Sequence, residues 1–149
     1  MHVLRAEKGY VIVGQDTDGS VTPIDLGMDW IVSKKKDFIG KRSLFRADTA
    51  RDNRKQLVGL KTENSTVVLP EGAQLVNGFS SSRPVPMVGH VTSSYFSATL
   101  GHSIALALIK GGRARLGGTV YAPLLDGQLI KATIPEPVFY DSDNVRQRD

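Results

Sequence analysis

Residues 57–76 read LVGLKTENSTVVLPEGAQLV, and no other segment of the chain indicates the fold class as clearly. It contains three short apolar runs, 57–60, 67–69 and 73–76, separated by polar residues and by the turn-forming sequence PEG at 70–72. Short apolar runs at this spacing, with turn residues between them, are typical of strands in a small β-sandwich or β-barrel. We therefore expect three short strands here.

The residues that follow continue this pattern. Residues 77–86 contain glycine, three consecutive serines and two prolines, which predicts a loop. Strand character resumes at 88–92. The run IALALI at 104–109 is apolar all round and short, so periodicity does not separate a buried strand from a buried helix there.

A hairpin signal lies near the C-terminus. Asp126 and Gly127 separate the runs 121–125 and 128–134, which predicts a β-hairpin with a type I′ turn. Alternate residues of the second run, Ile130, Ala132 and Ile134, share one face of the predicted strand. We expect that face to be core.

The N-terminal third lacks this regular spacing of short apolar runs. Residues 3–7 precede Lys8-Gly9, which predicts a helical turn ended by a glycine cap. Residues 10–13 read as a short β-type run, and 30–32 (WIV) read as a buried strand with its tryptophan in the core. Residues 41–47 (KRSLFRA) predict a short amphipathic helix. A polar linker at 48–56 is the best candidate for a domain boundary.

Composition limits the class of protein. The chain has 149 residues, a net charge of +4 and no cysteine, so it has neither disulfides nor a thiolate zinc site. No window approaches the roughly 18 consecutive apolar residues of a membrane span, and the N-terminus lacks a signal-peptide core. We expect a soluble, non-exported, cytoplasmic protein with no membrane partner.

Positive charge is concentrated between residues 34 and 55, which hold nine lysines and arginines against three aspartates. A carboxylate-bearing cofactor, an acidic protein surface or nucleic acid would all fit this segment. A solvated helix and loop fits equally well. No aromatic residues cluster with arginines as in RNA-recognition motifs, so nucleic acid is the least supported partner.

Familiar catalytic and metal motifs are not found in the sequence. The glycine-rich residues 111–118 lack the Walker ending and the dinucleotide spacing, so they read as a tight loop. Asp16 could begin a calcium loop, but Gly27 stands at the twelfth position, where such a loop needs glutamate. The histidines have no metal-ligand or triad spacing, and no serine is in a nucleophile elbow. We expect no metal site and no catalytic residue in this chain.

Ordered motifs run from about residue 4 to about residue 140. They are LRAEKG (4–9), GQDTD (14–18), TP (22–23), GMDW (27–30), KDFIGK (36–41), LVGL (57–60), GHVTS (89–93), TLG (99–101) and IALA (104–107). Together they resemble the aminomethyltransferase, or glycine cleavage T-protein, superfamily. Within it, GQDTDG (14–19) and PVFYD (137–141) are most similar to the alpha subunit of heterotetrameric sarcosine oxidases. Ser94 and Ala98 stand where T-proteins usually have glycine and proline.

The resemblance implies an α+β fold with three parts. Residues 1–55 would be the C-terminal part of an aminomethyltransferase-like folate-binding domain, 56–141 a small antiparallel β-barrel, and 142–149 a polar tail. It also implies that Glu7 binds tetrahydrofolate, because a carboxylate can accept the 2-amino and N3–H donors of a pterin as a bidentate pair. A solvent-exposed glutamate on a helical turn is the alternative for Glu7.

The resemblance further places a basic residue near the glutamate tail of folate, where this chain has Lys34, Lys35 and Lys36. Lys36 aligns best, and a lysine supplies charge without the fork of an arginine. The superfamily's general base, an aspartate, and its pterin-stacking tyrosine belong to the half of the domain before residue 1, so the chain looks like a fragment that is inactive alone. FAD, FMN and NAD are implied only for the full holoenzyme, as are the other subunits of a hetero-oligomeric sarcosine oxidase.

The implied function is therefore the tetrahydrofolate-binding portion of an enzyme that demethylates sarcosine to glycine, transfers the one-carbon unit to tetrahydrofolate and forms hydrogen peroxide. One alternative is the C-terminal half of a glycine-cleavage aminomethyltransferase, with a lipoylated carrier protein as partner. Another, from a different class, is a basic module that binds nucleic acid or an acidic protein.

Overall fold

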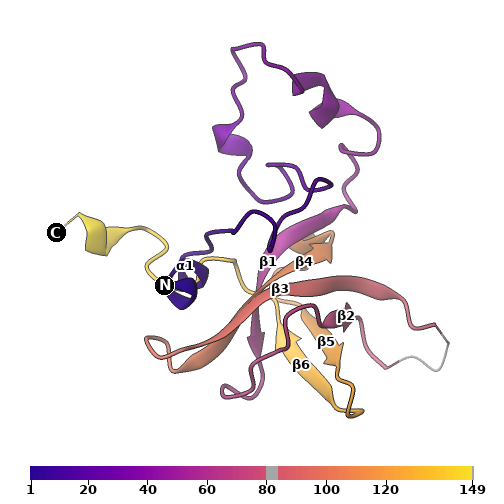
Figure 1. Ribbon diagram of the computed structural model, residues 1–149, viewed down its shortest axis with the longest axis vertical. Coiled ribbons are helices and arrows are strands. Elements are labelled where there is room, and N and C mark those ends of the chain that lie inside the picture. The colour runs from indigo at the N-terminus through magenta and orange to yellow at the C-terminus, as the bar shows by residue number, and fades with distance from the viewer. Residues whose placement is uncertain (80–83, 149) are drawn as a thin grey trace.

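Six antiparallel strands close into a barrel in the order β1-β4-β3-β2-β5-β6 in the computed structural model, which describes residues 1–79 and 84–148 (Figure 1). Pairing of β6 with β1, through Lys61 with Thr133 and Thr62 with Ala132, completes the ring. The strands are β1 (Lys55–Thr62), β2 (Gln74–Val76), β3 (Met87–Ser97), β4 (His102–Lys110), β5 (Thr119–Pro123) and β6 (Leu129–Thr133). The predicted small antiparallel barrel is confirmed.

Residues 104–109, for which periodicity does not separate strand from helix, belong to strand β4. Both faces of this strand are covered. Ala105, Ala107 and Ile109 point into the barrel core, while Leu106 and Leu108 pack on the outside. The outer cluster also contains Leu57 of β1, and the N-terminal segment and Phe139 pack on it. A strand buried on both faces loses the alternation that usually marks a strand.

The predicted hairpin forms between β5 and β6, with Ala132 and Ile134 fully buried and Ile130 packed against the core. Its turn differs from the type I′ prediction. Only Gly127 has a positive φ, whereas a type I′ turn needs two such residues. Hydrogen bonds from Gly127 N to Leu124 O and from Leu124 N to Gln128 O close a three-residue loop with a bulge instead.

Two predicted strands are wrong, and in both places a side chain bonds backbone groups that a strand would have used. Residues 67–69 form no strand, because the hydroxyl of Thr62 donates to Val67 O at 3.0 Å and holds a turn. Residues 10–13 contribute only an isolated bridge between Val13 and Thr17, since the carboxylate of Asp16 accepts the N–H of Ile12 at 2.8 Å.

The prediction of a buried strand at residues 30–32 is also wrong. The segment is a 3-10 helix, η1 (Asp29–Ile31), and Trp30 is 80% exposed. A closed barrel has no free edge with which another strand could pair. The amphipathic helix expected at 41–47 is likewise a 3-10 helix, η2 (Lys41–Phe45), whose Phe45 ring faces solvent.

The N-terminal helix α1 (His2–Glu7) packs beside β3 and β4, and it ends before Gly9, which has the positive φ predicted from the sequence. Two further 3-10 helices are η3 (Gly112–Arg115), inside the predicted glycine-rich loop, and η4 (Val145–Gln147) in the tail.

The C-terminal segment returns to α1, so both termini lie on one side of the barrel (Figure 1). Within the described ranges no helix is long and apolar enough to span a membrane. The loop predicted at 77–86 lies partly outside them.

Candidate folate site and adjoining pocket

Glu7 is the last residue of α1 and only 3% exposed, so the alternative of a solvent-exposed glutamate is wrong. Its Oε1 accepts a hydrogen bond of 2.6 Å from the hydroxyl of Ser97 at the end of β3. Ser97 Oγ in turn accepts the N–H of Leu100 at 3.0 Å, which fixes the orientation of the hydroxyl. No described residue donates to Oε2 of Glu7. A carboxylate oxygen has two lone pairs, so both oxygens retain acceptor capacity.

A second buried carboxylate, Asp16, holds α1 against the barrel. Arg5 forms an ion pair with Oδ2 of Asp16 and donates to Ser93 Oγ at 2.6 Å. Asp16 Oδ1 also accepts the hydroxyls of Thr92 at 2.5 Å and Ser93 at 2.6 Å. Burial raises the pKa of Asp16, but the hydrogen bonds from Ser93, Thr92, Ile12 and Arg5 outweigh it and hold the pKa below its ordinary value. Arg5, two residues before Glu7, therefore helps to hold α1 against the barrel.

The C-terminal segment closes over the end of α1. The backbone N–H groups of Phe139 and Tyr140 both donate to Glu7 O, at 2.8 and 3.0 Å. Lys8 Nζ donates to Asp141 O at 2.6 Å and to Asn144 at 2.7 Å, so the first part of the polar tail is anchored. The backbone of Tyr140 thus lies beside that of Glu7, although the two residues are near opposite ends of the chain.

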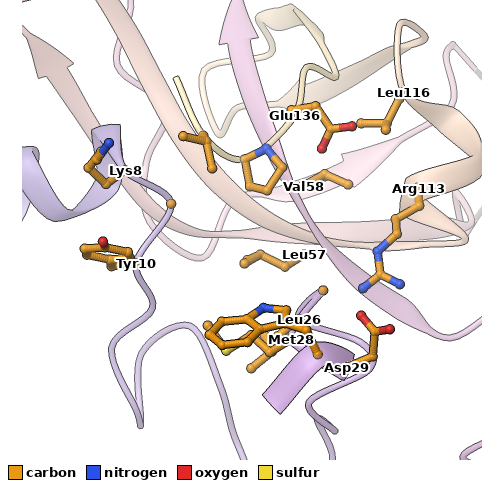
Figure 2. Close-up of a pocket in the computed structure, with 15 residues that line it drawn as sticks. Lys8, Tyr10, Leu26, Met28, Asp29, Leu57, Val58, Arg113, Leu116 and Glu136 are labelled. Carbon is orange, nitrogen blue, oxygen red and sulfur yellow. The ribbon is translucent and has the colours of Figure 1, made fainter. Parts of the chain in front are cut away.

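A pocket of about 500 Å³ lies beside residues 8–10, which directly follow α1 (Figure 2). Its apolar wall includes Leu26, Met28 and Leu57, and the exposed ring of Trp30 lies at the same wall. Charged groups lie around this wall: Lys8, Asp29, Arg113 and Glu136. Such a mixture of apolar surface and a few polar groups is usual for a small-molecule site or a domain contact.

The structure does not bring the three predicted lysines to Glu7. Lys34, Lys35 and Lys36 are exposed on the loop between η1 and η2, at the top of Figure 1, whereas α1 lies beside the barrel. They line a shallow pocket with Asp29 and Trp30.

Sequence reasoning missed two residues that the fold places at Glu7, namely Ser97 and Tyr140. Ser97 carries no motif signal, and only the pairing of β3 with β4 and the packing of α1 bring its hydroxyl to the carboxylate. Tyr140 lies within the motif PVFYD (137–141), which indicates the family but does not predict where in the fold Tyr140 lies. Among the described residues no group of three or more His, Asp or Glu side chains is placed to bind a metal ion.

This barrel, with a helix and a C-terminal segment packed on it, is that of the glycine cleavage T-protein family, to which the chain belongs. Residues 55–141 match the glycine cleavage T-protein C-terminal barrel domain, and residues 1–36 match the GCVT N-terminal domain.

Individual relatives make the resemblance more specific. The chain is 50% identical, over 149 residues, to the sarcosine oxidase alpha subunit of Corynebacterium sp. (strain U-96), which confirms the resemblance found in the sequence. It is 34% identical over 138 residues to the aminomethyltransferase of Thermotoga petrophila. These alignments cover 99% and 93% of this chain but 15% and 35% of the relatives, so the chain spans a minor part of either protein.

A solved structure supports the same assignment. The aminomethyltransferase T of the glycine cleavage system from Bartonella henselae superposes with a TM-score of 0.78 and 25% identity. The match covers 95% of this chain and 38% of the Bartonella chain. The fold is therefore shared along almost the whole of the present sequence.

Proposed function

We propose that this chain is the C-terminal portion of a sarcosine oxidase alpha subunit and that it contributes to a tetrahydrofolate site. The observation that carries the proposal is the 50% identity to such subunits over 99% of the chain. In this proposal residues 1–55 complete a folate-binding domain, residues 56–141 form the barrel that supports it, and residues 142–149 are the tail.

Glu7 is the proposed pterin ligand. Its carboxylate is shielded from water and oriented by Ser97, which lowers the entropy lost when a ligand binds. Oε2 has no described donor and Oε1 keeps one lone pair, so the carboxylate fits the paired 2-amino and N3–H groups of a pterin. The backbone N–H of Tyr140 donates to Glu7 O at 3.0 Å and helps to fix the residue that bears this carboxylate.

Lys34, Lys35 and Lys36 are proposed to attract the carboxylates of the folate glutamate tail, with Lys36 the main contributor. Their exposure on one loop suits a flexible, charged ligand end. An ammonium group acts as a point charge without a bidentate fork, so this contact contributes less to orientation than Glu7 does.

In the complete enzyme, sarcosine would lose two electrons to a flavin, and the resulting imine would pass its one-carbon unit to tetrahydrofolate. The products are glycine, 5,10-methylenetetrahydrofolate and, after the flavin is reoxidised by dioxygen, hydrogen peroxide. FAD, FMN and NAD would be held outside this chain, by other parts of a cytoplasmic hetero-oligomeric oxidase. The residues of this chain bind and position folate, which accelerates transfer through proximity.

A second candidate is the C-terminal part of an aminomethyltransferase, favoured by the 34% identity to the Thermotoga protein. The two functions differ in the molecule that donates the one-carbon unit. An oxidase consumes sarcosine and dioxygen, while an aminomethyltransferase takes the one-carbon unit from a lipoylated carrier. Activity of the full-length enzyme with each donor distinguishes them.

A basic module of another class would instead show strongly salt-dependent binding that is lost in Lys34→Glu and unaffected by Glu7→Ala.

The folate contact is tested by calorimetric titration of the full-length enzyme with tetrahydrofolate. Glu7→Gln and Glu7→Ala remove a charge-assisted pair, which should weaken binding about 30-fold or more. Glu63→Gln is the matched control, because Glu63 is exposed and its one ion pair among the described residues is with the partly exposed Lys131. Equal affinity in the wild type and both Glu7 variants would exclude Glu7 as a pterin ligand.

A further inference from the structure

A separate pocket of about 250 Å³ lies on the outer surface of the barrel, where β1, β4 and β3 are neighbours. Lys55 is the first residue of β1, Lys110 is the last residue of β4, and His90 belongs to β3. Leu108 also lines the pocket, and Asp18 of the N-terminal segment faces it. None of these residues is part of the proposed folate contact.

The two lysines are directly opposite each other in the β1–β4 register. Like charges in facing positions of an antiparallel pair destabilise the sheet. Neither Lys55 nor Lys110 takes part in an ion pair with any residue of 1–79 or 84–148. The pocket therefore carries two positive charges that an anion would neutralise.

The arginines that line the same pocket already have carboxylate partners. Arg54 bonds Asp25 at 2.8 Å and Asp48 at 3.1 Å, and Arg51 pairs with Asp48. Their charge is largely compensated within the protein, so the charge that no ion pair of the described residues compensates belongs to the two lysines, although the Asp18 carboxylate also attracts Lys55. The two lysines therefore differ from the two arginines of this pocket, whose charges are paired with carboxylates.

His90 adds a third group that can donate to an anion. Its Nδ1 lies 3.5 Å from Lys55 Nζ. Burial and the charge of Lys55 lower the pKa of His90, and the carboxylate of Asp18 opposes them. A bound anion would favour the protonated imidazole and raise the pKa of His90. The remaining charged groups lining the pocket are Lys110, Arg51 and Arg54.

We propose that this pocket binds a tetrahedral oxyanion of the phosphate class, held by Lys55, Lys110 and His90. Two ammonium groups outside the ion pairs of the described residues attract an anion, and donors from three neighbouring strands suit a group with several acceptor oxygens. The carboxylate of Asp18, which is fixed by Ser20 N at 2.8 Å and Ser20 Oγ at 2.6 Å, weakens the attraction at the rim.

The test is a titration of the 149-residue chain with inorganic phosphate, followed by NMR of the histidine ring protons at constant ionic strength. Phosphate should raise the pKa of His90 and leave the ring-proton chemical shifts of His2 and His102 unchanged. Lys110→Gln should weaken phosphate binding about tenfold, and Asp18→Asn should strengthen it several-fold. Lys61→Gln, which removes a charge from β1 outside the pocket, is the control and should change nothing.

Three outcomes would overturn the proposal. The pKa of His90 could be the same in phosphate and chloride, which means that no phosphate binds beside it. Lys61→Gln could weaken binding as much as Lys110→Gln, which means that only general charge acts. Citrate could bind more tightly than phosphate and more tightly still in Asp18→Asn, which means that the site is a carboxylate site. Thermal unfolding in phosphate and chloride checks binding independently, because a ligand specific to the folded state raises Tm.

Discussion

The hydroxyl of Ser97 lies 2.6 Å from Oε1 of Glu7 and joins the end of β3 to the end of α1 across 90 residues of sequence. Through this bond the barrel orients a carboxylate of the N-terminal helix. The proposed folate site thus depends on the contact between the two parts of the chain as well as on Glu7 itself.

Ser97→Ala should lower the free energy of unfolding by about 2 kcal/mol, because Oε1 of Glu7 and the N–H of Leu100 both lose a buried partner. Urea unfolding of the chain measures this. The exposed Ser142→Ala should leave the free energy of unfolding unchanged. If Ser97→Ala were as stable as the wild type, the hydrogen bond would contribute nothing to the attachment of α1.

Breaking the buried ion pair between Arg5 and Asp16 should cost more. Asp16→Asn removes one charge and leaves the Arg5 guanidinium without its counter-ion, which should destabilise the fold by about 3 kcal/mol. Asp37→Asn is the control, because Asp37 is fully exposed and its contact with Lys41 is 3.5 Å. Equal midpoints of urea denaturation for the two variants would contradict the prediction.

Stability should fall in acid because two buried carboxylates, Asp16 and Asp25, have lowered pKa values in the folded state. Burial raises the pKa of Asp25, but hydrogen bonds from Arg54 and Thr22 outweigh it, and Asp16 behaves in the same way. A lowered folded-state pKa gives stability that is complete above the unfolded pKa of about 4 and is lost as the pH falls through the folded value. Urea unfolding at a series of pH values measures this loss, and it should be smaller in Asp25→Asn.

Gly59→Ala should detach the C-terminal segment from β1. A Cβ at Gly59 would lie 2.6 Å from Glu136 O and 2.7 Å from the Phe139 ring, so the segment that carries Tyr140 must move. We expect a loss of about 2 kcal/mol or more in the free energy of unfolding, together with weaker folate binding by the full-length enzyme. Gly19→Ala is the matched control, since its Cβ meets nothing within 4 Å and its φ is not positive. An unfolding midpoint unchanged by Gly59→Ala would show that the segment is not packed there.

Local signals predicted those elements whose conformation depends on neighbouring residues. The cap at Gly9 and the hairpin around Gly127 follow from backbone preferences that act over a few residues. The strand at 104–109 could not be assigned in this way, because its apolar outer face is explained only by the N-terminal segment that covers it. The prediction that Trp30 lies in a buried strand is wrong for a related reason. A strand needs a free edge to pair with, and the closed barrel offers none.

The sequence alone determined the family and the identity of Glu7 as a candidate ligand, because ordered motifs survive in the chain whatever their positions in space. Only the tertiary structure decided that Glu7 is buried against Ser97, that Tyr140 lies beside it and that Lys34, Lys35 and Lys36 lie apart. It also decided that Lys55, Lys110 and His90 share a pocket. These contacts join residues far apart in the chain, and such contacts form through barrel closure and packing, which no local pattern specifies.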